Sequence, residues 1–126
     1  MTCRDLRVYV VDPEVAFREA LASNLRDDGH TVGESANGLE LSERSLIVGN
    51  LVTITEYELP QVTGLQLADR LHAVRRDLPV IVVTACDLRI VEAMTGKRPY
   101  VWILPKSASY DEIHSLVHRT AAKSRH

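Results

Sequence analysis

Four polar side chains in the sequence each stand at the end of a short apolar run. These strand-end residues are Asp12, Glu56, Thr84 and Lys106, which bring two acids, a hydroxyl and an ammonium. If the runs are parallel strands of one sheet, the four groups meet at the rim where open α/β sheets place their ligands and chemistry. An acid that ends a buried strand also needs a partner for its charge. The pattern therefore predicts one site assembled from distant segments.

The apolar runs are short and rich in Val and Ile, which is typical of strands buried on both faces of a parallel sheet. They are Val8–Val11, Leu51–Thr55, Val80–Thr84 and Val101–Leu104, with a weaker run at Thr31–Val32.

Apolar residues at helical spacing lie between these runs. They are Phe17, Ala20, Leu21 and Leu25, then Leu67, Leu71 and Val74, and finally Ile113, Leu116, Val117 and Ala121. The segment Leu39–Leu46 gives a weaker helical signal, and Leu88–Met94 a short one. Gly29 suits the end of the first helix and Ser109 the cap of the last. The alternation predicts a doubly wound α/β fold with about five helices.

Length and composition predict one domain over residues 1–126, with a core over about 5–120 and a frayed tail over 121–126. The net charge of −2 gives no general attraction to nucleic acid or membranes. Two cysteines, Cys3 and Cys86, are too few for a disulfide framework and are expected to be reduced. Together with an N-terminus that does not resemble a signal peptide, they indicate a cytoplasmic protein.

From Arg7 to about Val117, the chain resembles the receiver domain of bacterial two-component response regulators. Glu56 stands four residues before Pro60 and eight before Gly64, as the acid of the family's loop does. The segments Val80–Ala85 and Ile103–Ser107 match the family's switch strand and lysine segment.

The resemblance implies a five-stranded parallel sheet in the order 2-1-3-4-5. In the family, an aspartate after the third strand accepts a phosphoryl group from a histidine kinase, and nearby acids hold Mg²⁺. Glu56 takes the acceptor position here, and Asp12, Glu14 and Glu56 form the acidic pocket. Thr84 matches the hydroxyl and Lys106 the lysine that bind the phosphoryl oxygens.

Two departures from the family pattern affect the chemistry. Glu56 is one methylene longer than aspartate, and a misplacement on the order of 1 Å can cost ~100-fold in rate. Pro13 replaces an acid that binds the metal, and proline offers no side-chain ligand. We therefore expect no cofactor, or weak Mg²⁺ binding at most. The hypothesis is an atypical receiver held in one conformation by a salt bridge between Glu56 and Lys106.

The expected role is a signalling module without enzymatic activity. It would bind an output domain, a sensor kinase or a second copy of itself through the last two helices and the strand between them. Tyr100 and Trp102 are interface candidates if strand alternation turns them away from Val101 and Ile103. The alternative is that both aromatic rings pack beneath a flanking helix.

Several alternatives stay open. The chain could be a conventional Mg²⁺-dependent phosphoaccepting receiver. It also faintly resembles haloacid-dehalogenase phosphatases through Asp12, Glu14, Thr84 and Lys106. Each strand-end residue also has an ordinary structural interpretation. Asp12 could be a helix cap and Glu56 a loop acid. Thr84 could be a common strand threonine and Lys106 a surface lysine. His114 and His118 have a metal-binding spacing, but no third ligand is evident, so a solvated helix edge is the plainer interpretation.

Overall fold

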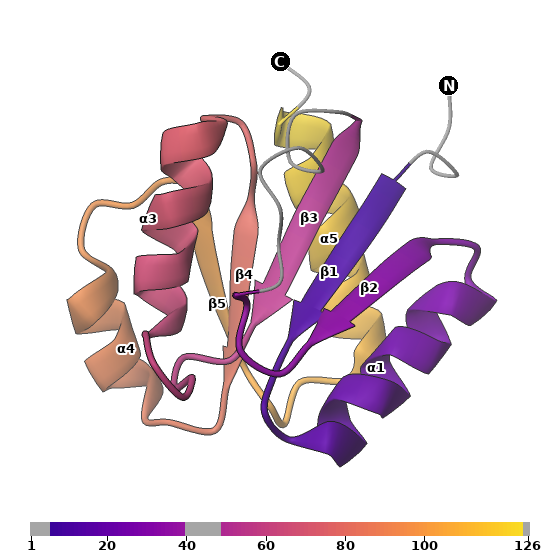
Figure 1. Cartoon of the computed structure of the whole chain (residues 1–126), viewed down its shortest axis with the longest axis horizontal. Helices are drawn as coiled ribbons and strands as arrows, with labels where there is room; N and C mark the ends of the chain where they lie inside the picture. Colours follow the sequence, from indigo (N-terminus) through magenta and orange to yellow (C-terminus); the bar gives the residue numbers. More distant parts are fainter. Residues whose placement is uncertain (1–5, 40–48, 125–126) are drawn as a thin grey trace.

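The computed structural model describes residues 6–39 and 49–124, which form a parallel sheet with helices packed on it (Figure 1). The strand order is β2-β1-β3-β4-β5, as predicted. The strands are β1 (Leu6–Val11), β2 (Thr31–Ser35), β3 (Asn50–Thr55), β4 (Val80–Thr84) and β5 (Val101–Pro105). All four ladders between neighbouring strands are parallel.

Four helices lie within the described residues, where about five were expected. They are α1 (Val15–Asp27), α3 (Gly64–Val74), α4 (Leu88–Thr95) and α5 (Tyr110–Ser124). The weak helical segment Leu39–Leu46 falls almost entirely outside the described residues, as does Cys3. None of the helices in the described ranges combines the length and the apolar character that a membrane crossing requires.

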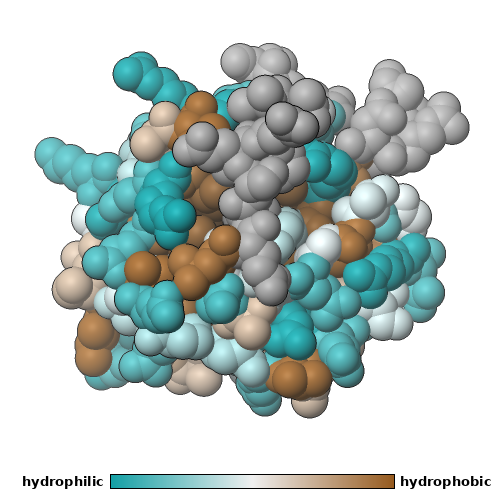
Figure 2. Space-filling model, viewed as in Figure 1, coloured by the Kyte–Doolittle hydropathy of each residue, from teal (hydrophilic) through white to brown (hydrophobic). Residues whose placement is uncertain are grey.

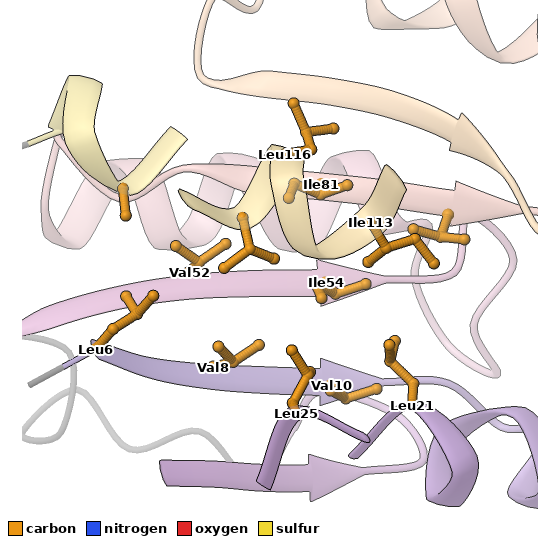
Figure 3. Close-up of a cluster of buried hydrophobic side chains, with 13 residues drawn as sticks. Leu6, Val8, Val10, Leu21, Leu25, Val52, Ile54, Ile81, Ile113 and Leu116 are labelled. Atoms are coloured by element: carbon orange, nitrogen blue, oxygen red, sulfur yellow. The ribbon is translucent and has the colours of Figure 1, made fainter. Parts of the chain in front are cut away.

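The Val- and Ile-rich runs form the sheet because both of their faces are covered. Every residue of β4 is buried, and five of the six residues of β3 are buried. On one face, β1, β3 and β4 pack against α1 and α5, and Figure 3 shows Leu21, Leu25 and Ile113 pointing into this layer. On the other face, α3 and α4 cover the sheet.

Helix ends follow the predicted local signals. Gly29 stands after α1 with a φ of 93°, a conformation that glycine adopts without strain. Ser109 and Glu112 exchange hydrogen bonds before α5, which forms the expected cap. α5 continues to Ser124, and Ala121 is buried against the core, while the fraying of the tail over 121–126 stays a prediction.

Candidate functional site

The strand-end residues meet at one rim of the sheet, past the carboxyl ends of neighbouring strands. Backbone bonds continue the sheet pairing into this rim. The Glu56 amide donates to the Val11 carbonyl at 3.0 Å, and the Lys106 amide donates to the Thr84 carbonyl at 2.9 Å. The sheet therefore fixes the backbone positions of Glu56 and Lys106.

The Lys106 ammonium lies at the centre of this rim and contacts three carboxylates. Its Nζ is 2.9 Å from Asp12 Oδ2, 2.8 Å from Glu14 Oε1 and 3.2 Å from Glu56 Oε1. The side chain is 16% exposed, and Nζ also lies 4.7 Å from the centroid of the Phe17 ring. Burial alone would lower the pKa of Lys106, but its contacts with the three carboxylates raise it above its usual value. We call Asp12, Glu14, Glu56 and Lys106 the acid pocket.

Asp12 is the most buried acid of the pocket, with 2% of its surface exposed. Its Oδ1 accepts a hydrogen bond from the Glu14 amide at 2.8 Å. Its Oδ2 lies 2.9 Å from the Lys106 ammonium, which is the charge partner of this buried oxygen. Burial raises the pKa of Asp12, and this outweighs the lowering by the Glu14 amide and Lys106. Because Glu14 holds the N-cap position of α1, Asp12 is not that helix's N-cap.

Both carboxylate oxygens of Glu56 have partners. Oε2 accepts a hydrogen bond from the Tyr57 amide at 2.5 Å. Oε1 accepts from the Ala85 amide at 3.4 Å and lies 3.2 Å from the Lys106 ammonium. The expected contact between Glu56 and Lys106 is therefore present, and the buried carboxylate has the charge partner that it requires.

The loop after Glu56 is held tightly against the start of α3. The Gly64 amide donates to the Tyr57 carbonyl at 2.6 Å, and a Cβ at Gly64 would lie 2.5 Å from the Glu56 carbonyl oxygen. Thr63 and Gln66 form a capping box that begins α3 at this point. Glycine is thus required eight residues after the acid because the two backbones touch.

Thr84 ends β4 with its side chain buried. Its Oγ1 accepts a hydrogen bond from the Cys86 amide at 2.9 Å, which ties it to the turn before α4. Among the described residues, no hydrogen bond joins this hydroxyl to the acid pocket. Cys86 itself is a free thiol.

The acid pocket fits one ammonium better than a hydrated Mg²⁺ ion. Mg²⁺ requires near-octahedral oxygen ligands, and Pro13 contributes no side-chain oxygen. The inward-facing oxygens of Asp12 and Glu56 already contact the Lys106 ammonium. A metal ion would have to displace that cation from the carboxylates that hold it.

Tyr100 and Trp102 do not share a face, so that part of the interface prediction was wrong. Tyr100 stacks on His72 with ring centroids 3.8 Å apart, and its hydroxyl donates to Asp69 at 2.6 Å. Trp102 packs with the core layer beneath α1 and α5. The reason is that β5 begins at Val101, so strand alternation does not reach Tyr100. Both rings are half-buried, which agrees with the alternative prediction that they pack beneath flanking helices.

The sequence analysis identified only two of the three histidines in a second polar cluster. His114 and His118 do not form a solvated edge, because His30 joins them with Nε2 2.8 Å from His114 Nε2. We call these three residues the histidine cluster. Burial and the neighbouring imidazole of His114 lower the pKa of both His30 and His118. His30 is 84 positions from His114 in the chain, and its place directly after Gly29 was the only local signal.

Comparison with curated proteins relates the chain to response regulators. It is 30% identical over 122 residues to the response regulator MprA of Mycobacterium ulcerans, and 29% identical over 122 residues to MprA of Mycobacterium leprae. Each alignment covers 91% of this chain, and 51% and 52% of the respective relative. The chain thus spans about half the length of the curated relatives it matches.

Solved receiver domains share the fold. A response regulator receiver domain protein from Clostridium thermocellum superposes with a TM-score of 0.83 at 16% identity, covering 95% of this chain and 97% of that one. The receiver domain of the hybrid histidine kinase CckA gives a TM-score of 0.74 at 22% identity, covering 91% and 98%. At such identities the likeness concerns the fold alone.

The family model described as "Response regulator receiver domain" matches residues 8–118, which include every strand-end residue. This match leaves the haloacid-dehalogenase alternative without support. Receiver domains of this kind are typically signalling modules that interact with protein partners. The chain belongs to the response regulator receiver domain family of two-component systems.

Proposed function

We propose that this domain is an atypical receiver that signals through protein contacts and without phosphoryl transfer to Glu56. The observation that carries the proposal is the position of Lys106, whose ammonium contacts all three carboxylates of the acid pocket. A cation from the chain itself thus stands among the acids that would otherwise hold Mg²⁺.

The geometry of Glu56 supports the same conclusion. Its two oxygens are engaged by two backbone amides and by Lys106. In-line attack on a phosphodonor would require the carboxylate to leave these partners, and it would start from a side chain one methylene longer than aspartate. Misplacement on the order of 1 Å can cost ~100-fold in rate.

The proposed contact surface is formed by α4, β5 and α5. On α4, Ile90 and Met94 are 61% and 57% exposed. Figure 2 shows hydrophobic surface at the position that α4 occupies in Figure 1. Exposed apolar side chains of this size are suited to a protein partner, which would be an output domain, a sensor kinase or a second copy of the chain. Neither nucleic acid nor a membrane is part of this proposal.

The test is incubation of the protein with acetyl phosphate and Mg²⁺, followed by intact-mass measurement. The expected result is no stoichiometric gain of a phosphoryl group on the wild type. The matched control is the double variant Pro13→Asp/Glu56→Asp, which restores the family's acids and should gain one phosphoryl group under the same conditions. A stoichiometric gain on wild-type Glu56 would overturn the proposal.

A conventional phosphoaccepting receiver is the second candidate, because Thr84 and Lys106 both remain at the strand ends. It predicts that wild-type protein gains the phosphoryl group only when Mg²⁺ is present. The same mass measurement with and without a chelator therefore distinguishes the two candidates.

A further inference from the structure

In the histidine cluster, the Nε2 atoms of His30 and His118 both contact the Nε2 atom of His114. His114 Nε2 lies 2.8 Å from His30 Nε2 and 3.1 Å from His118 Nε2. One potential ligand atom from each ring can be chosen so that all three lie within 4.8 Å of one another. The cluster combines the residue before β2 with two residues of α5, so it is separate from the acid pocket at the carboxyl ends of the strands.

The backbone places these rings with little freedom. The Gly29 amide donates to the Arg26 carbonyl and the His30 amide to the Leu25 carbonyl, which is the Schellman pattern at the end of α1. His30 is therefore fixed at the first position after the turn, with only 6% of its surface exposed. His114 and His118 are four residues apart on α5, so their rings share one side of the helix.

Hydrogen bonding between neutral rings satisfies only one of the two contacts of His114 Nε2. A neutral imidazole nitrogen carries either one hydrogen or one lone pair, and His114 Nε2 faces two other ring nitrogens. His30 adds a second deficit, because its Nδ1 is buried and makes no hydrogen bond. Three imidazoles with ring nitrogens this close together are a donor set that a metal ion with imidazole ligands accepts.

Asp28 adds an outer partner of the kind that metal-binding histidines have. Its Oδ2 lies 3.5 Å from His114 Nδ1 and accepts a hydrogen bond from the Tyr110 hydroxyl at 2.6 Å. A carboxylate at Nδ1 favours the tautomer with the hydrogen on Nδ1, which leaves the Nε2 lone pair for a metal. Tyr110 in turn holds the carboxylate in place.

We propose that His30, His114 and His118 bind one Zn²⁺ ion, or a similar divalent transition-metal ion, through their Nε2 atoms. Zn–N bonds of about 2.0–2.1 Å place the nitrogens of a tetrahedral site roughly 3.3 Å apart, so the closest pair here needs to separate by a few tenths of an ångström. The fourth position would hold water or a ligand from a partner protein. The bound ion would tie the end of α1 to α5, a helix of the proposed contact surface.

The first experiment is titration of untagged, chelator-treated protein with Zn²⁺ by calorimetry and with Co²⁺ by visible absorption. We expect one saturable site and the intense absorption of tetrahedral Co²⁺.

The chain has five histidines, so the double variant His72→Gln/His126→Gln retains only the histidines of the cluster and should bind as the wild type does. His118→Gln and His114→Gln should abolish the tetrahedral signal, and Asp28→Asn should weaken Zn²⁺ binding by about 10-fold.

Nitrogen-detected NMR of the histidine rings tests the contribution of His30 without a buried substitution. With Zn²⁺, the Nε2 signals of all three cluster residues should shift to metal-bound values, while those of His72 stay unchanged. The proposal is overturned if wild-type protein shows no saturable site, if binding survives in His118→Gln, or if His30 does not respond.

Discussion

The acid pocket and the histidine cluster both assemble groups from distant segments, but they treat charge in opposite ways. In the acid pocket, one ammonium contacts three carboxylates, so a cation of the chain itself lies among the acids. In the histidine cluster, three groups of the same kind face one another, and one carboxylate, Asp28, lies beside them. We propose that the lysine makes Mg²⁺ binding at the acid pocket weak, whereas the three imidazoles of the histidine cluster bind a metal ion.

The largest effect should come from removing the cation of the acid pocket. Lys106→Met leaves Asp12 and Glu56 buried without their charge partner, and breaking such a pair costs about 3–5 kcal/mol. The measurement is the free energy of unfolding in urea, with Lys97→Met as the control because Lys97 is exposed. Equal losses in the two variants would show that Lys106 does not stabilise the pocket.

The next largest losses of stability should come from glycines whose backbone supports the acid pocket and the histidine cluster. Gly64→Ala places a Cβ 2.5 Å from the Glu56 carbonyl oxygen, and such overpacking costs about 1–3 kcal/mol. Gly29→Ala beside the histidine cluster meets no atom within 4 Å, so its cost of about 1–2 kcal/mol comes from the positive φ alone. Urea denaturation compares the two variants. If Gly64→Ala is as stable as the wild type, the loop does not hold Glu56 as tightly as the structure indicates.

The histidine cluster should make the metal-free protein sensitive to mild acid. The pKa values of His30 and His118 lie below the usual 6.5, chiefly because of burial, while Asp28 opposes the shift. As pH falls below 6.5, the unfolded chain therefore binds protons before the folded chain does, and stability falls until the folded pKa values are passed.

Urea denaturation in a chelating buffer, at about pH 7.5 and about pH 5.5, measures this loss. His118→Gln should show a smaller pH dependence than the wild type, and His72→Gln the same dependence. A wild-type stability that does not change over this interval would contradict the assignment of buried, neutral imidazoles.

The smallest effect should come from Glu14, the exposed member of the acid pocket. Its side chain is 60% exposed, so its pairing with Lys106 is screened by water and salt. Glu14→Gln should change the free energy of unfolding by about 0–1 kcal/mol. A loss as large as that of Lys106→Met would mean that the exposed acid, and not the buried pair, holds the lysine.

The sheet and much of the acid pocket could be predicted from sequence because both depend on local patterns. The Val and Ile run of β4 indicates a strand buried on both faces, and the polar residue that follows each strand must lie at the shared rim. The lysine segment could be paired with Glu56 because parallel strands bring their carboxyl ends together.

What could not be predicted depends on side-chain packing between distant segments. No periodic signal links His30 to α5, because it lies in a turn and its partners are helical. Tyr100 was misplaced because β5 begins one residue later, and the ring instead stacks on His72.

The most direct test of the central claim is NMR observation of the Lys106 ammonium while Mg²⁺ is added. If Lys106 stays paired with Asp12 and Glu56, its Nζ signal should remain unchanged at Mg²⁺ concentrations that shift the signal in Pro13→Asp/Glu56→Asp. A saturable shift of the wild-type signal, with matching shifts of the Asp12 and Glu56 carboxyl carbons, would show that Mg²⁺ displaces the lysine and would contradict this account.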